Sequence, residues 1–120
     1  MKADMLTSVL NELNGTSADI EASGVISTDG LMMASVLPAG MDEDRVGAMS
    51  AAMLSLGDRT AQELNRGHLE QVLIKGRHGY VLMTYAGEEA VLTVLAKPNA
   101  KLGLIFLDVK RAAESIAEML

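Results

Sequence analysis

Three apolar runs in the second half of the chain are joined by connections of only a few residues. The runs cover residues 68–75, 80–86 and 90–97, and they are rich in Val, Leu, Ile and Tyr. β-Branched and aromatic residues are enriched in strands. Connections this short allow only antiparallel hairpins, because a parallel pair needs a crossover of roughly a dozen residues or more. The second half of the chain therefore predicts three consecutive antiparallel strands.

A further hairpin is predicted nearer the N-terminus. Residues 19–28 and 31–37 are two strand-like runs joined by Asp29-Gly30. An Asp-Gly pair in this position favours a two-residue type I′ turn, with positive φ at both central residues. Asp29 could instead serve as a general base or a metal ligand, but no second carboxylate or His accompanies it nearby in the sequence. The turn is the better interpretation of this aspartate.

Helical periodicity marks three other segments, residues 2–14, 43–65 and 101–120. In the first, Leu6, Leu10 and Leu13 fall on one stripe. Asp42 is the expected N-cap of the second helix, with Glu43 and Asp44 in the first turn, where the helix dipole favours negative charge. Capping explains this acidic trio without a bound cation.

The middle helix is predicted to have two distinct faces. Its large apolar stripe consists of Val46, Met49, Met53, Leu56 and Leu64, and a stripe of small residues runs beside it. A surface helix normally needs one apolar stripe to cover the core. A helix with two such faces can pack against two different neighbours.

The order helix, strand, strand, helix, strand, strand, strand, helix predicts an α+β fold. Its core is one antiparallel sheet with helices packed on the faces. Residues 1–120 carry no evident linker, repeat or low-complexity tract, and the length suits one domain.

Charge and composition exclude several classes of function. The formal net charge of −6 argues against nucleic acid as a partner, because phosphate binding needs a basic face. There is no Cys for a disulfide or thiol chemistry, and no apolar run long enough to span a bilayer. Without an evident secretion signal, the expected location is the cytoplasm.

No motif in the chain predicts an active site. The basic stretch 75–79, "KGRHG", lacks the spacing of a phosphate-binding loop and suits a hairpin tip. His68 and His78 lack the spacing of zinc ligands. We therefore predict no catalytic, cofactor-binding or metal-binding residue, and a protein that is not an enzyme.

The sequence resembles the roadblock/dynein light chain family, particularly its bacterial members that accompany Ras-like GTPases. The matching stretches are "SGVISTDGLMMAS" (23–35), the long Ala/Met-rich helix, and residues 68–116. The resemblance covers essentially the whole chain as one roadblock-like domain. It implies a five-stranded antiparallel sheet in the order 2-1-5-4-3, with the long helix on one face and the terminal helices on the other.

The resemblance also implies a homodimer through strand three and the long helix. Strand three would be a free edge that pairs with its copy, and an exposed edge strand needs such cover on physical grounds. Met49, Met53 and Leu56 are expected to face the sheet. The expected dimer contacts are Ala48, Ala51, Ala52, Ser55, Glu70, Val72 and Ile74.

The implied function is to regulate or scaffold a small Ras-like GTPase without catalysis. The helix pair would form the partner surface, with Arg59, Gln62 and Arg66 as candidate contacts. Three alternatives remain open at this stage: a small-ligand sensor of the PAS or GAF type, a dynein-light-chain-like adaptor, and a purely structural homodimer. The small number of aromatic residues makes a sensor pocket less attractive.

Overall fold

The computed structural model describes residues 2–120 and contains three helices and one sheet of five strands. The elements are α1 Lys2–Thr16, β1 Ile20–Ser27, β2 Met32–Val36, α2 Glu43–Glu63, β3 Gln71–Gly76, β4 Gly79–Ala86, β5 Ala90–Ala96 and α3 Leu102–Met119. All neighbouring strands pair antiparallel, in the order β2-β1-β5-β4-β3. The predicted element order and sheet order are confirmed.

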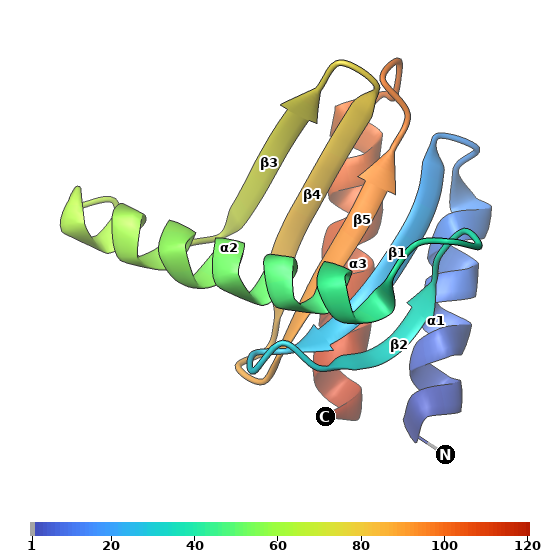
Figure 1. Ribbon diagram of the computed structural model, residues 1–120, viewed down its shortest axis with the longest axis horizontal. Helices are drawn as coiled ribbons and strands as arrows, with labels where there is room; N and C mark the ends of the chain where they lie inside the picture. The colour runs from blue at the N-terminus through green and yellow to red at the C-terminus, as the bar shows by residue number, and fades with distance from the viewer. Residues whose placement is uncertain (1) are drawn as a thin grey trace.

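Helices cover both faces of the sheet (Figure 1). Helices α1 and α3 lie on one face, where Leu10, Leu92 and Ile116 belong to the larger buried core. Helix α2 lies alone on the other face, over a smaller core that includes Leu54 and Met83. The two faces are therefore covered to different extents, and this difference shapes the exposed surface.

The hairpin between β1 and β2 differs from the predicted two-residue turn. Gly30 has φ of 94°, but Asp29 has no positive φ, so the prediction of a type I′ turn is wrong. The Gly30 amide donates to the Ser27 carbonyl at 2.9 Å, and the Leu31 amide donates to the Ser27 hydroxyl at 3.1 Å. The connection between the two strands covers residues 28–31, and its left-handed conformation falls on the glycine, where it costs least.

Both ends of α2 follow from local chemistry. The Asp42 side chain accepts hydrogen bonds from the amides of Asp44 and Arg45, at 2.9 and 3.2 Å, which confirms the predicted N-cap. The helix ends at Glu63, two residues earlier than predicted. Asn65 and Gly67 then adopt positive φ, of 60° and 85°, and redirect the chain toward β3.

Small residues let α2 approach the sheet closely. A Cβ atom at Gly47 would lie 2.6 Å from the Gly30 carbonyl oxygen. Further along the helix, the buried Ser50 hydroxyl forms a 2.8 Å hydrogen bond with that of Thr93 on β5. Leu54 then fills the smaller core. The side of α2 that meets the sheet is thus mostly small.

The prediction that Met49, Met53 and Leu56 face the sheet is wrong. Their exposed fractions are 56%, 37% and 62%, so these three side chains lie outside the core. The physical reason is the close approach at Gly47, because long side chains on the sheet side would hold the helix off the strands. The structure therefore leaves a row of large apolar side chains on the surface.

Replacing Gly47 with Ala tests this close approach. The added methyl group meets backbone rather than a flexible side chain, so we expect Gly47→Ala to lower the free energy of unfolding by roughly 1–3 kcal/mol. Gly103→Ala is the matched control, because a Cβ at Gly103 meets nothing within 4 Å. Thermal or denaturant unfolding measures both. Equal stability of the two variants would contradict the proposed packing.

Candidate interaction surface

Strand β3 is a free edge of the sheet. It pairs with β4 on one side and with no strand among residues 2–120 on the other. Val72 and Ile74 point to the α2 face, where they pack against the smaller core. Because side chains alternate along a strand, Leu73 points to the opposite face, and it is 41% exposed. The edge thus offers unpaired backbone groups beside apolar side chains.

Helix α2 extends past this edge (Figure 1). It crosses the sheet from the β1–β2 turn, at Gly47, to β3, where a Cβ at Gly57 would lie 3.1 Å from the Val72 side chain. The helix continues to Glu63, and at 1.5 Å per residue this adds about 9 Å beyond that contact. We call the segment 58–66 the overhang, because no strand among residues 2–120 lies beneath it.

One carboxylate fixes the base of the overhang. Asp58 accepts a 2.9 Å hydrogen bond from the Leu69 amide and a 2.8 Å hydrogen bond from the Gln62 side chain. The exposed His68 ring lies 4.0 Å from the same carboxylate. The pKa of Tyr85 is raised, mainly by burial and secondarily by the negative charge of Asp58. Asp58 therefore holds the end of α2 to the segment that leads into β3.

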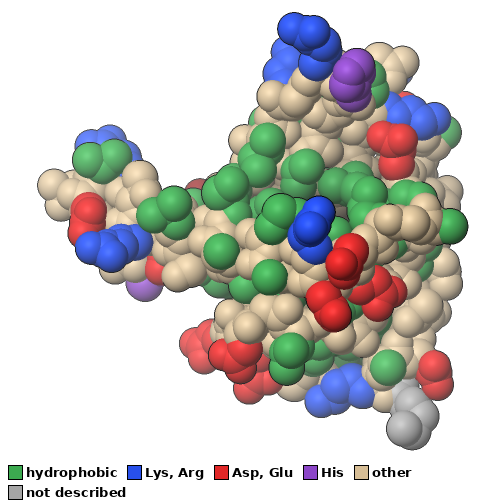
Figure 2. Space-filling view, in the orientation of Figure 1, with side chains coloured by type: hydrophobic (Ala, Val, Ile, Leu, Met, Phe, Trp, Pro, Cys, Tyr) green, Lys and Arg blue, Asp and Glu red, His purple; other side chains and the backbone are tan. Residues whose placement is uncertain are grey.

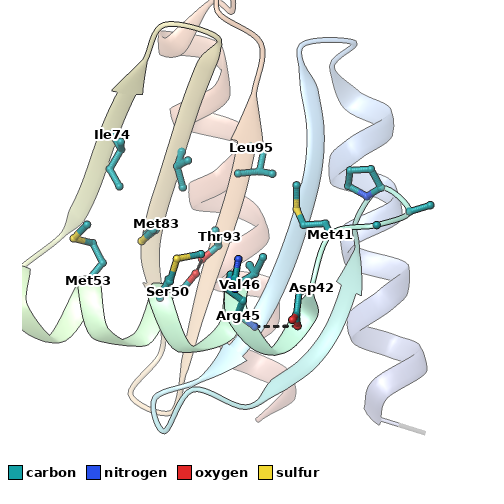
Figure 3. A pocket seen from close by; sticks show the side chains of 15 residues that line it. Met41, Asp42, Arg45, Val46, Ser50, Met53, Ile74, Met83, Thr93 and Leu95 are labelled. Atoms are coloured by element: carbon teal, nitrogen blue, oxygen red, sulfur yellow. Dashed lines mark hydrogen bonds between the residues drawn. The ribbon is translucent and has the colours of Figure 1, made fainter.

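A large apolar hollow lies between α2 and the uncovered part of the sheet (Figure 3). Its volume is about 730 Å³. The lining residues are Pro38, Ala39, Gly40, Met41, Asp42, Arg45, Val46, Met49, Ser50, Met53, Ile74, Val81, Met83, Thr93 and Leu95. Figure 2 shows the same region as a band of hydrophobic side chains above the helix. Four methionines give this surface adaptable side chains that repack readily against a neighbour.

Strand register fixes where the hollow lies relative to α2. Val72, Met83 and Thr93 form one row across β3, β4 and β5, and α2 packs over this row. Ile74, Val81 and Leu95 form the next row that faces the same side, and they line the hollow. The hollow is therefore a strip of uncovered sheet that runs alongside α2 toward the free edge.

The sequence-predicted contact residues fall into separate groups. Val72 and Ile74 lie on the free edge, whereas Glu70 precedes β3, which begins at Gln71 rather than at residue 68. Ala51 is half-buried near the β1–β2 turn. The remaining small residues of α2 are exposed, namely Ala48, Ala52 and Ser55. Contact of these residues with a second copy stays a prediction.

The three residues predicted to contact a partner all lie on the overhang. Arg59 donates to Glu63 at 3.2 Å in an exposed pair, and Gln62 is held by Asp58. Arg66 is exposed just beyond the helix end and donates to the Leu64 carbonyl at 3.1 Å. What the sequence did not reveal is the hollow, because its lining combines three strands, a loop and one side of α2.

Neither a metal centre nor a membrane span is present in the part of the chain that the structure describes. Residues 2–120 contain no group of three or more His, Asp or Glu side chains arranged to hold a metal ion. No helix in the same range is long and apolar enough to cross a bilayer.

One family model matches most of the chain. Residues 5–96 match the family described as the Roadblock/LC7 domain. The chain is 47% identical over 115 residues to protein MJ1340 of Methanocaldococcus jannaschii. The aligned region covers 96% of this chain and 99% of that protein.

Solved structures share the fold. A structure of MglB with a tetrameric arrangement superimposes with a TM-score of 0.89 at 22% identity, covering 98% of this chain and 89% of MglB. A Roadblock/LC7 domain from Streptomyces avermitilis gives 0.87 at 18% identity, covering 93% and 94% of the two chains.

Removing the Asp58 carboxylate tests how the overhang is held. We expect Asp58→Ala to cost roughly 1.5–3 kcal/mol of stability, because charge-assisted hydrogen bonds are lost. It should also speed hydrogen exchange at the Leu69 amide. Asp58→Asn keeps an acceptor oxygen and should have a smaller effect. Slow exchange at Leu69 in Asp58→Ala would show that other contacts hold the overhang.

Proposed function

The chain belongs to the Roadblock/LC7 domain family, and we propose that it works as a homodimer that binds a small Ras-like GTPase and favours one of its nucleotide states. The observation that carries this proposal is the combination of the free β3 edge, the overhang and the hollow. The tetrameric arrangement of MglB, which has the same fold, supports self-association. The proposed role is binding, without catalysis by the chain itself.

A second copy completes the sheet if its β3 pairs antiparallel with the first. Such a pair is related by a twofold axis perpendicular to the sheet at the middle of β3. A free edge favours this pairing, because it satisfies backbone groups that are otherwise left to water. Closed twofold dimers are also the commonest symmetric assembly.

The position of the hollow supports one register for this pairing. Rotation about an axis at Leu73 places Val72 of one copy opposite Ile74 of the other. The overhang of each α2 continues along its own Val72 row and would therefore lie over Ile74 and Val81, at the edge end of the Ile74, Val81 and Leu95 row of the second copy. That row lines the hollow. One register thus pairs the edges and fills both hollows.

In this arrangement the two α2 helices lie side by side and antiparallel. Met49 and Met53 line the side of α2 that borders the hollow, and Leu56 continues the same stripe. We assign the contact between the helices to these residues. Their exposure in one chain is then explained, because packing against the second helix removes them from water.

The outer side of the helix pair forms the surface offered to the GTPase. Arg59, Gln62 and Arg66 project from each overhang and are exposed. A partner shifts the equilibrium of a GTPase only when it binds the two nucleotide states with different affinity. The proposal therefore requires binding that depends on the nucleotide.

A small-ligand sensor is the second candidate that an observation favours. The hollow is apolar and its volume suits a ligand pocket. We prefer a second copy as its occupant because a ligand would leave both the β3 edge and the overhang uncovered. A dynein-light-chain-like adaptor would use the same dimer with a different partner, and binding experiments separate these roles.

A single cysteine tests the dimer and its register, because the chain has no cysteine of its own. In the proposed register Leu73 lies opposite Leu73 of the second copy, with Cα atoms about 4.5–5.5 Å apart. This separation suits a disulfide. We expect Leu73→Cys to form a covalent dimer under mild oxidation, measured by non-reducing electrophoresis.

Two neighbouring variants serve as controls. Gln71 and Lys75 lie opposite each other in the same register, so Gln71→Cys and Lys75→Cys should each remain uncrosslinked alone. A mixture of the two should crosslink. Crosslinking of Gln71→Cys alone would overturn the register, and a wild-type monomer at micromolar concentration in light scattering would overturn the dimer.

Nucleotide-dependent binding tests the proposed partner. The probe is the purified Ras-like GTPase encoded closest to the gene for this chain, loaded with GDP or with a non-hydrolysable GTP analogue. We expect a Kd at least about tenfold lower for one form, which corresponds to about 1.4 kcal/mol. Isothermal titration calorimetry measures both. Equal or absent binding would contradict the proposal.

A further inference from the structure

Positive side chains gather at one end of the sheet. Lys75 lies near the end of β3, Arg77 lies in the β3–β4 turn, and Lys97 and Lys101 lie between β5 and α3. Strand register brings the two groups together, because Lys75, Tyr80 and Ala96 form one row across three strands. All four side chains are exposed. In Figure 2 this end carries Lys, Arg and His side chains at the top of the molecule.

These cations have no acidic partner in the part of the chain that the structure describes. The ion pairs within 4.0 Å among residues 2–120 are Arg59 with Glu63 and His68 with Asp58. Lys75 instead lies over the Tyr80 ring, 6.0 Å from its centroid. Asp19 lies at the same end, where its carboxylate accepts from the Lys101 amide at 3.4 Å.

The distribution is notable because the chain as a whole is acidic, with a net charge of −6. Glu88 and Glu89 occupy the β4–β5 turn and Asp29 the β1–β2 turn, at the opposite end of the strands. The acidic turns therefore lie at one end of the sheet, and at the other end Lys75, Arg77, Lys97 and Lys101 outnumber Asp19 and Glu21. Unpaired exposed cations contribute little to stability, so the gathering calls for a role other than holding the fold.

We propose that this end, together with the overhang of a second copy, forms a cationic surface that docks an acidic face of the GTPase. The inference rests on the proposed dimer and its partner. In that dimer the overhang of one copy would lie over the edge end of the Ile74, Val81 and Leu95 row of the other. This row is next to the Lys75 row along the strands, so Arg59 and Arg66 of the second copy would approach the same end from the α2 face. Lys75 itself lies on the opposite face with Tyr80, and Arg77 and Lys97 lie at the end of the sheet beyond both rows. Neither copy forms this surface alone.

A compact protein surface fits these cations better than a membrane or a nucleic acid does. The α2 face also carries Asp42, Glu43 and Asp44, which are exposed at the start of the helix. A flat anionic bilayer would meet those carboxylates together with the cations. A small acidic patch on a globular partner can contact the cationic end without them. The net charge of −6 disfavours long polyanions in the same way.

Complementary charge of this kind acts mainly on the rate of association. Exposed charges steer two proteins together, and salt screens them over a Debye length of about 8 Å at physiological ionic strength. The binding of the GTPase should therefore weaken as salt rises.

Charge reversal tests the surface from both copies. Arg77→Glu/Lys97→Glu changes the end of the sheet, and Arg59→Glu/Arg66→Glu changes the overhang. We expect each double variant to raise the Kd for the GTPase, in the nucleotide state it prefers, on the order of tenfold, and to flatten its dependence on salt. Lys110→Glu/Arg111→Glu is the matched control, because both residues are exposed on α3 across the sheet. It should leave the Kd within about twofold of wild type.

The outcomes separate this inference from the function on which it rests. Sedimentation velocity checks that every variant remains dimeric. If the wild type binds the GTPase and the two double variants bind equally well, only the cationic surface is overturned. If the wild type does not bind, both proposals fail. Vesicles of equal parts phosphatidylserine and phosphatidylcholine form a second arm. The inference would be overturned, and the surface assigned to lipid, if the wild type bound these vesicles, Arg77→Glu/Lys97→Glu did not, and the same variant still bound the GTPase.

Discussion

The close approach of α2 to the sheet determines most of the exposed surface. Gly47 faces the Gly30 carbonyl, the Ser50 hydroxyl bonds to Thr93, and Gly57 faces Val72. The contact side of the helix consists largely of small residues together with Leu54, so Met49, Met53 and Leu56 point elsewhere. Packing at this distance also buries the hydroxyl groups of Ser50 and Thr93, which form a hydrogen bond with each other. Among the described residues, no buried polar side-chain atom lacks a hydrogen-bond partner.

A single helix that crosses the strands cannot cover a five-stranded sheet. On the other face, α1 and α3 together cover the sheet and bury a larger core. On the α2 face, the row of Ile74, Val81 and Leu95 stays open, and the end of the helix extends past β3. In the proposed dimer, one twofold rotation would bring the helix end of each copy over the uncovered strip of the other.

The elements of the fold could be predicted from the sequence because their signals are local. Short connections required antiparallel strands, and the Asp42 carboxylate marked the start of α2. The orientation of α2 could not be predicted in the same way. Hydropathy ranks Met49 and Met53 above Gly47 and Ser50, whereas distance from the strands decides which of them fits against the sheet. The spacing of Gly47, Ser50, Leu54 and Gly57 repeats every three or four residues and was the available signal. The turn at Gly30 was missed because the Ser27 side chain takes part in it.

If the overhang both fills the hollow of a second copy and supplies cations to the partner surface, dimerisation and partner binding are thermodynamically linked. A GTPase that contacts Arg77 of one copy and Arg59 of the other binds the dimer more tightly than it binds a single chain. By reciprocity, the bound GTPase must then stabilise the dimer by the same factor. Asp58 belongs to both processes, since it holds the overhang to the segment before β3. Loss of its carboxylate would weaken partner binding without touching any residue of the cationic surface, because the overhang would no longer be fixed over the second copy.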